Sequence, residues 1–303
     1  MALVSAIPNR TVAFGALAAL AAGAALLLLW PGHDAGRAAV GGDLFARLSN
    51  AGAGSLTVGL PPPAVQRIYG APGTRGRPIV LLDAGHGGRD PGARSQDGEA
   101  AEKDLSLALA SELRDLLVKR GRVRVAMTRE GDQYLTLDER AAIARRLSAA
   151  LFVSLHMDSA PNQLARGVSV YSLSDVASDG DAARFALAEN RSARGKAAAG
   201  DPVEALLSDL EMRTRMSASA DLAARMVAKS AGRVGLRPQP HRFAAFHVLR
   251  QSNTPAVLVE AGYLSNVEDE ALLRSPAYRS ALAAALAQAI EADVATRAAR
   301  AQR

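Results

Sequence analysis

Short apolar runs alternate with longer segments of helical periodicity from residue 79 onward, and this alternation most constrains the fold of the 303-residue chain. The runs with the length and apolar content of buried strands are 79–83, 123–128, 151–155, 167–172 and 256–259. The segments with helical character are 102–120, 136–147, 176–195, 203–231 and 276–298. The alternation predicts an α/β domain in which a mostly parallel, twisted sheet carries helices on both faces.

Local signals mark the ends of two of these helices. Gly121 directly follows the first helix and is typical of a C-terminal stop. Thr136 precedes the second helix, and Glu139 stands three residues later, which is the pattern of a capping box. The sequence therefore places these two boundaries independently of any tertiary contact.

The N-terminal segment is apolar without interruption. Residues 11–30 contain no charge and match the roughly 20 residues that a helix needs to cross a bilayer. Arg10 precedes them and favours a cytoplasmic N-terminus. We predict that residues 1–30 form a hydrophobic helix that is either a signal peptide or a signal anchor. The run exceeds the roughly 7–15 apolar residues of a cleaved signal, which favours an anchor in the inner membrane. Either reading predicts a periplasmic location for the rest of the chain.

The segment that follows has the composition of a tether. Residues 31–76 are rich in glycine, alanine and proline and include the run 61–63 of three prolines. Such a composition predicts a flexible, partly extended linker. We therefore expect one folded domain over residues 77–303. The absence of cysteine from the chain excludes a disulfide framework, a thiolate metal site and a cysteine nucleophile.

The charge of the chain is positive, with a formal net charge of +6. A basic chain can bind nucleic acid, but no nucleic-acid-binding motif is present and the predicted export argues against such a partner. Attraction to an acidic cell-wall polymer or to anionic lipid headgroups explains the charge more simply. We therefore predict no nucleic-acid partner.

Four polar residues stand where the predicted strands end or a helix begins. His86 follows the first strand, His156 and Glu260 directly follow two others, and Glu102 opens the first helix. Ligands of a parallel sheet bind at the carboxyl ends of its strands, so we expect these side chains to meet. Two imidazoles and a carboxylate are the ligands of many catalytic zinc sites, and a further carboxylate is a suitable general base. Each residue alone would more often serve as a loop hydrogen-bonding group or helix-terminal acid.

Five segments carry a resemblance to zinc-dependent N-acetylmuramoyl-L-alanine amidases. In chain order they read LLDAGHGGRDPGA, EKDLSLALA, MTRE with LTLDERAAIA, FVSLHMDSA and AVLVEAGYLSN. The resemblance implies that His86, Glu102 and His156 bind Zn²⁺ and that Glu260 is the catalytic acid and base. It implies hydrolysis of the peptidoglycan amide between the lactyl group of N-acetylmuramic acid and the L-alanine of the stem peptide. The chain departs from the family's usual residues at Ala84, Met157 and Tyr263, and these departures remove no reacting group.

The region around 174–215 is longer than a minimal amidase requires. The resemblance to division-associated amidases, which split the septal cell wall, implies a helical insert that blocks the zinc cleft until an activator protein of the LytM-domain type displaces it. Our candidate for the blocking residue is Glu189, although Ala193 stands where the similar stretch has aspartate. Glu204 and Glu211 are rival candidates, and a solvated surface excursion is the simpler alternative.

Other residues of the matched segments are expected to support the site. Arg129 and Arg140 should hold structure through hydrogen bonds, and Asp83 should either orient the neighbouring histidine or cap a turn. Asn266 is expected to organise the loop after the last strand. His247 matches no ligand position, which predicts a packing or surface role.

Two other function classes stay open at this point. A non-catalytic cell-wall-binding protein could keep the fold, but it would be expected to lose a zinc ligand or the catalytic glutamate, and the chain retains all four residues. A zinc hydrolase acting on another amide would keep the same residues, since specificity depends on the shape of the cleft.

Overall fold

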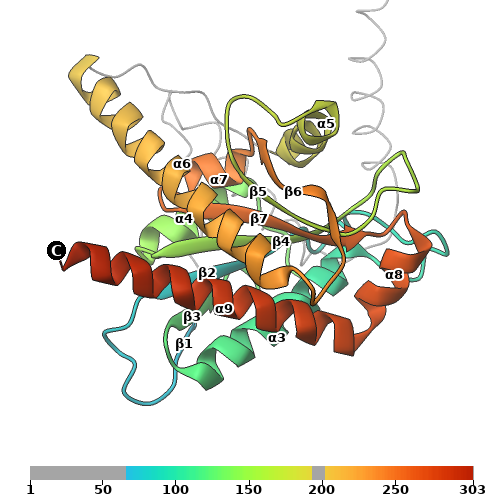
Figure 1. Ribbon diagram of the computed structural model, residues 1–303, viewed down its shortest axis with the longest axis horizontal. Helices are drawn as coiled ribbons and strands as arrows, with labels where there is room; N and C mark the ends of the chain where they lie inside the picture. The colour runs from blue at the N-terminus through green and yellow to red at the C-terminus, as the bar shows by residue number, and fades with distance from the viewer. Residues whose placement is uncertain (1–65, 193–201, 303) are drawn as a thin grey trace, which may run out of the picture. The chain divides into compact units, whose positions relative to one another are not determined.

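A computed structural model describes residues 66–192 and 202–302 (Figure 1). The predicted signal or anchor at 1–30 and most of the predicted linker lie outside the described residues. Within the described part of the chain, no helix combines the length and apolar character needed to span a membrane.

A seven-stranded sheet organises the domain, in the order β1-β3-β2-β4-β7-β5-β6. Its strands are β1 (Ile68–Tyr69), β2 (Ile79–Ala84), β3 (Arg124–Met127), β4 (Leu151–Asp158), β5 (Val168–Leu173), β6 (Leu236–Ala244) and β7 (Ala256–Tyr263). The central strands β3, β2, β4 and β7 run parallel, and β5 pairs with β6 in parallel but with β7 in the antiparallel sense. The predicted mixed α/β architecture with a mostly parallel sheet is confirmed.

Helices cover both faces of the sheet. They are α3 (Glu102–Arg120), α4 (Leu137–Arg146), α5 (Gly180–Glu189), the 3₁₀ turn η1 (Asn190–Ser192), α6 (Pro202–Ser230), α7 (His247–Gln251), α8 (Val267–Arg274) and α9 (Pro276–Ala301). In β2, Val80 and Leu82 pack in the apolar cluster that includes residues of α3, α6 and α9, whereas Leu81 packs in the cluster that includes residues of α4, α5 and α7. Both faces of the strands are therefore buried, as a parallel sheet requires.

The predicted helix boundaries follow from local chemistry. Gly121 ends α3 with a positive φ of 65°, and its backbone N–H donates to the carbonyls of Leu117 and Val118. Thr136 accepts a hydrogen bond from the backbone N–H of Glu139, while the Glu139 side chain accepts one from the backbone of Thr136. The predicted stop and the predicted capping box are both confirmed.

The domain begins earlier than the sequence predicted. β1 lies inside the expected linker and pairs with β3 in the antiparallel sense. The Gln66 side-chain amide donates to the carbonyls of Met127 and Thr128, at 2.7 and 2.9 Å, and the Tyr69 hydroxyl donates to Glu130 at 2.6 Å. A two-residue strand has no visible alternation, and its partners lie about 60 residues away, so local sequence gave no signal for it.

Candidate active site

Two histidines meet at the carboxyl ends of neighbouring strands. His86 follows β2 and takes a left-handed backbone conformation with φ 59°, whereas His156 lies within β4. Their ring centroids are 5.0 Å apart and the ring planes are nearly perpendicular. His156 was expected just after its strand. The strand continues past it because its backbone stays paired with β7, in which Glu260 lies opposite His156.

Glu102 joins the two histidines from the first turn of α3. Its Oε1 accepts hydrogen bonds from His156 Nδ1 and from the Met157 backbone, both at 2.9 Å. Its Oε2 lies 3.1 Å from His86 Nε2 and accepts a bond from the Ala93 backbone at 2.8 Å. Burial alone would raise the pKa of Glu102, but the charge of His86 and the hydrogen bonds from both histidines lower it. The carboxylate is therefore ionised at neutral pH.

Glycines make room for this arrangement at two positions. A Cβ atom at Gly92 would lie 2.5 Å from Glu102 Oε2 and 2.6 Å from His86 Cδ2, and its φ of 65° also favours glycine. A Cβ atom at Gly85 would meet the His156 ring at 2.5 Å. The glycine-rich loop of the sequence thus serves close packing around the two histidines.

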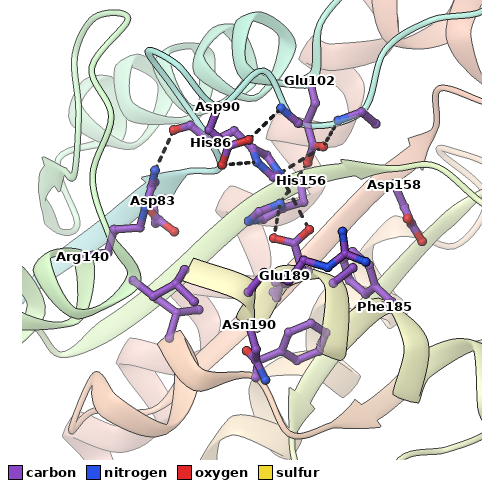
Figure 2. Close-up of a pocket in the computed structure, with 18 of the residues that line it drawn as sticks. Asp83, His86, Asp90, Glu102, Arg140, His156, Asp158, Phe185, Glu189 and Asn190 are labelled. Atoms are coloured by element: carbon purple, nitrogen blue, oxygen red, sulfur yellow. Dashed lines mark hydrogen bonds and ion pairs between the residues drawn. The ribbon is translucent and has the colours of Figure 1, made fainter. Parts of the chain in front are cut away.

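Glu189, at the end of α5, faces the same point (Figure 2). Its carboxylate oxygens lie 3.8 Å from His86 Nε2 and 3.6 Å from His156 Nδ1. Burial and the charges of Glu102 and Asp90 raise the pKa of Glu189, against the opposing effect of the two histidines. Two carboxylates, those of Glu102 and Glu189, thus lie beside the two imidazoles, and this concentration of negative charge favours a cation bound between them.

The rival glutamates of the insert differ from Glu189. Glu211 lies on α6 and is largely exposed, with Oε2 3.4 Å from Arg215 Nη1. The side chain of Glu204 lies outside the described part of the structure. Among the insert side chains that the structure describes, Glu189 is the glutamate brought to the histidines.

The separations among these donor atoms suit a small divalent metal. The distances of 2.9–3.8 Å between histidine nitrogens and carboxylate oxygens bracket the ~3.4 Å that separates ligands in a tetrahedral zinc site with bonds near 2.1 Å. Ligand atoms of His86, His156 and Glu189 all lie within 4.8 Å of one another. The residues present therefore fit zinc, with imidazole and carboxylate donors.

Glu260 lies one strand away from this cluster. It is fully buried in β7, and neither carboxylate oxygen makes a hydrogen bond of ordinary geometry among the described residues, although the backbone of Asp158 is close enough to favour the charged form. Burial, together with the charges of Asp158, Glu102 and Glu189, raises its pKa well above the ordinary value. Glu260 does not line the cavity of about 380 Å³ around the histidines, which α5 partly fills. A buried carboxyl group without partners is costly to retain, so it points to a role beyond packing.

A buried ion pair supports the loop that carries His86. Arg140 Nη1 donates to Asp83 at 2.6 Å, and its guanidinium also donates to the backbone carbonyls of Ala84 and His86. Arg129 donates to the carbonyls of Ala84 and Gly85. The predicted structural role of both arginines is confirmed.

Neither of the two roles expected for Asp83, orienting the neighbouring histidine or capping a turn, is what its contacts show. Its two carboxylate oxygens accept bonds from Thr128 and Ser154 in addition to Arg140, so they are committed to the scaffold. Asp90 takes the expected place instead, with Oδ2 3.0 Å from His86 Nδ1. Sequence reasoning missed Asp90, although a carboxylate four residues after a candidate ligand in a tight loop is a usable signal.

Two further expectations concern residues near the site. The side chain of Asn266 accepts from the backbone N–H groups of Glu268 and Asp269 and caps α8, as predicted for the loop after β7. His247 Nε2 lies 2.7 Å from Asp138 Oδ1, away from the histidine pair, which confirms a role in packing and surface contacts.

Comparison with known proteins agrees with this geometry. Residues 80–292 match the family model described as N-acetylmuramoyl-L-alanine amidase. The amidase AmiA of Escherichia coli (strain K12) is 34% identical over 220 residues, covering 71% of this chain and 75% of AmiA. AmiC of Escherichia coli O6:H1 is 33% identical over 256 residues, covering 82% of this chain and 60% of AmiC. The chain thus spans less than two-thirds of that second relative.

Solved structures share the fold. An N-acetylmuramoyl-L-alanine amidase from Clostridium difficile 630 superposes with a TM-score of 0.53 and 28% identity, covering 71% of this chain and 95% of that one. The family match extends over more than half of the chain. It agrees with the observed sheet and with the two converging histidines. This chain belongs to the N-acetylmuramoyl-L-alanine amidase family of enzymes.

Proposed function

We propose that this enzyme is a Zn²⁺-dependent peptidoglycan hydrolase of the periplasm that acts in splitting the septal cell wall. It would cleave the amide between the lactyl group of N-acetylmuramic acid and the L-alanine of the stem peptide. The observation that carries the proposal is the convergence of His86, His156 and Glu102 beside the buried, unpartnered Glu260.

His86, Glu102 and His156 would hold the metal. When bound, zinc lowers the pKa of a water molecule and polarises a carbonyl group. Glu102 also accepts backbone hydrogen bonds at both oxygens, which fixes the carboxylate relative to the histidines. Asp90 holds the far nitrogen of His86 and so orients that ring.

Glu260 would carry the proton from the attacking water to the departing amine. Its raised pKa suits a group that accepts a proton from the attacking water and then donates it to the departing amine nitrogen. Hydrolysis requires that transfer, because a free amide anion is a poor leaving group. Its backbone lies in register with that of His156 on the neighbouring strand, and the charges of Glu102 and Glu189 act on its carboxylate.

The insert would inhibit the enzyme through α5. Glu189 reaches both histidines and would occupy the position that water and substrate need. Displacement of α5 by an activator of the LytM-domain type would open the site. We also propose that the N-terminal segment delivers the enzyme to the periplasm, as a cleaved signal or as an inner-membrane anchor. Deleting residues 176–212 should raise the rate of the purified enzyme, and an unchanged rate would rule out autoinhibition.

Digestion of purified peptidoglycan with the zinc-loaded protein tests the reaction. Mass spectrometry should detect intact stem peptides with a free N-terminal L-alanine. Glu260→Gln should abolish their release while the protein still binds zinc. Normal turnover in that variant would refute the proposed role of Glu260, and cleavage at another amide would assign a different substrate.

A further inference from the structure

A second cavity adjoins the histidine cavity and has a different chemistry. It encloses about 590 Å³ among the loop after β4, helix α5 and strand β6. The two cavities share the lining residues Asp158, Ser159, Phe185 and Ala188. Figure 2 shows Asp158 and Phe185, two of the shared residues, on the same side of Glu189. A substrate bound at the histidines would therefore extend into this space once α5 has moved.

Among the described residues, three arginines line this second cavity. Arg166 pairs with Glu268, and Arg184 belongs to α5 itself and would leave with it. Arg237 lies on β6, in the wall that remains, and its side chain is only 15% exposed. A guanidinium in that position is a ready partner for a carboxylate.

Arg237 already binds a carboxylate, and α5 supplies it. One guanidinium nitrogen lies 3.1 Å from Asp181 Oδ2, and another donates to the Tyr263 hydroxyl. Asp181 is 54% exposed and lies in the first turn of α5, so the pair would separate if the helix moved away. Removal of α5 would leave Arg237 with the Tyr263 hydroxyl and with the charge of Asp158 on the same cavity wall, but with no carboxylate at hydrogen-bond distance among the described residues.

The spacing along α5 indicates how far from the cleaved bond this cation lies. Asp181 and Glu189 are eight residues apart on one helix, which corresponds to about 12 Å at 1.5 Å per residue. An extended peptide covers about 10–11 Å in three residues. With Glu189 at the reacting position, Arg237 is therefore within reach of the second or third residue of a bound stem peptide.

We propose that the second cavity binds the stem peptide and that Arg237 binds a carboxylate of the peptide's second or third residue. While α5 covers the site, the Asp181 carboxylate occupies the position of that substrate carboxylate. This inference rests on the proposed amidase function and adds a specificity-determining residue to it. The enzyme would then select anionic stem peptides over those in which the same carboxylates are amidated.

Paired synthetic substrates test the inference with the full-length, zinc-loaded protein. Each is an N-acetylmuramoyl tripeptide that carries either free carboxylates or carboxamides at the second and third residues. The wild type should prefer the carboxylate form by about tenfold in kcat/KM, the effect of one charge-assisted hydrogen bond. Arg237→Gln should lose this preference while its kcat/KM for the carboxamide form stays within about twofold of the wild type. Asp181→Asn should lower KM for the carboxylate form more than for the carboxamide form.

Controls separate this inference from the underlying function. Arg166→Gln changes another arginine of the same cavity, one that pairs with Glu268 and not with Asp181, and should keep the wild-type preference. Arg237→Lys retains the charge and should keep part of the preference, which guards against misfolding of the glutamine variant. Equal cleavage of both substrates by the wild type, or an unchanged preference in Arg237→Gln, would overturn the inference alone. Failure of both the wild type and a variant lacking residues 176–212 to cleave either substrate would instead refute the amidase function.

Discussion

The absence of a side chain at position 92 leaves room for the carboxylate that joins the two histidines. The same glycine has a positive φ, so Gly92→Ala combines a backbone strain with a steric overlap at Glu102. We expect zinc affinity to fall about 10- to 100-fold, as when a group that orients a metal ligand is disturbed. Competition with a chelator measures this affinity.

Gly98→Ala is the matched control for that substitution. Gly98 has a similar φ of 75°, but a Cβ atom there would meet nothing within 4 Å. In Gly98→Ala the loss of stability from backbone strain should be comparable to that in Gly92→Ala. The zinc affinity of this variant should equal that of the wild type. An equal loss of affinity in both variants would contradict the steric explanation.

The buried pair of Asp83 and Arg140 predicts a stability effect. Both side chains are at most 3% exposed, so Asp83→Asn would leave a buried guanidinium without its counter-charge. We expect a loss of about 3–5 kcal/mol in the free energy of unfolding, measured with urea. Asp175→Asn removes the exposed partner of Arg250 and should cost no more than about 1 kcal/mol.

The same pair predicts how stability responds to acid. Burial alone would raise the pKa of Asp83, but the charge of Arg140 and the hydrogen bonds that Asp83 accepts lower it below its usual range. A depressed folded pKa gives stability that is fully present above about pH 4 and is lost as the pH falls through the folded pKa. Below pH 4 the wild type should lose stability more steeply than Asp83→Asn, and parallel curves would contradict this assignment.

At the scale of elements, α5 connects the insert to the site at three places. Asp179 caps its first turn and accepts from Arg242, Glu189 faces the histidines, and Asn190 donates to the carbonyl of Ala245 directly after the helix. These contacts hold the helix against the end of the sheet. The sequence placed a helix here and singled out Glu189, but the Arg242 and Asn190 contacts join segments more than 50 residues apart and leave no local pattern.

Glu189→Ala should raise the basal rate of peptidoglycan cleavage several-fold. The substitution removes the carboxylate that would compete with water and substrate, without touching the other residues around the metal. Rates are compared on the same zinc-loaded preparations. Glu211→Ala, on the exposed surface of α6, should leave the rate unchanged, and equal rates for both variants would argue against a block by Glu189.

At the scale of the whole molecule, the strand order brings the candidate site residues together at the carboxyl ends of the central strands. β2, β4 and β7 are parallel neighbours, so His86, His156 and Glu260 come from adjacent strands. That convergence was predictable, because apolar runs and the residues after them are visible in sequence. β1, α7 and α8 were not predicted, since each is short and depends on distant contacts. β6 was not predicted either, because its sequence LRPQPHRFA is largely polar and contains two prolines. Asp90 was missed although it is the one carboxylate of the loop 85–93, because Asp83, directly before the loop, was an equally near candidate in sequence.

Zinc binding should stabilise the entire domain. A ligand that binds only the folded state, present at a concentration 100 times its Kd, adds about 2.7 kcal/mol to the free energy of unfolding. For a domain of this size that corresponds to a rise of about 5–10 °C in Tm. Thermal unfolding with and without zinc measures the shift. His156→Ala should abolish it, whereas a shift retained in that variant would place the metal elsewhere.

The length of α5 has a thermodynamic consequence. The helix has ten residues, fewer than the roughly 12–15 that an isolated helix needs in water, so its helical form depends on its contacts with the sheet. Leaving those contacts and losing helical structure are then a single event. The proposed block would therefore be a local folding equilibrium. Warming or mild denaturant would open the site before the sheet unfolds, and the proposed activator would act by binding the unfolded segment.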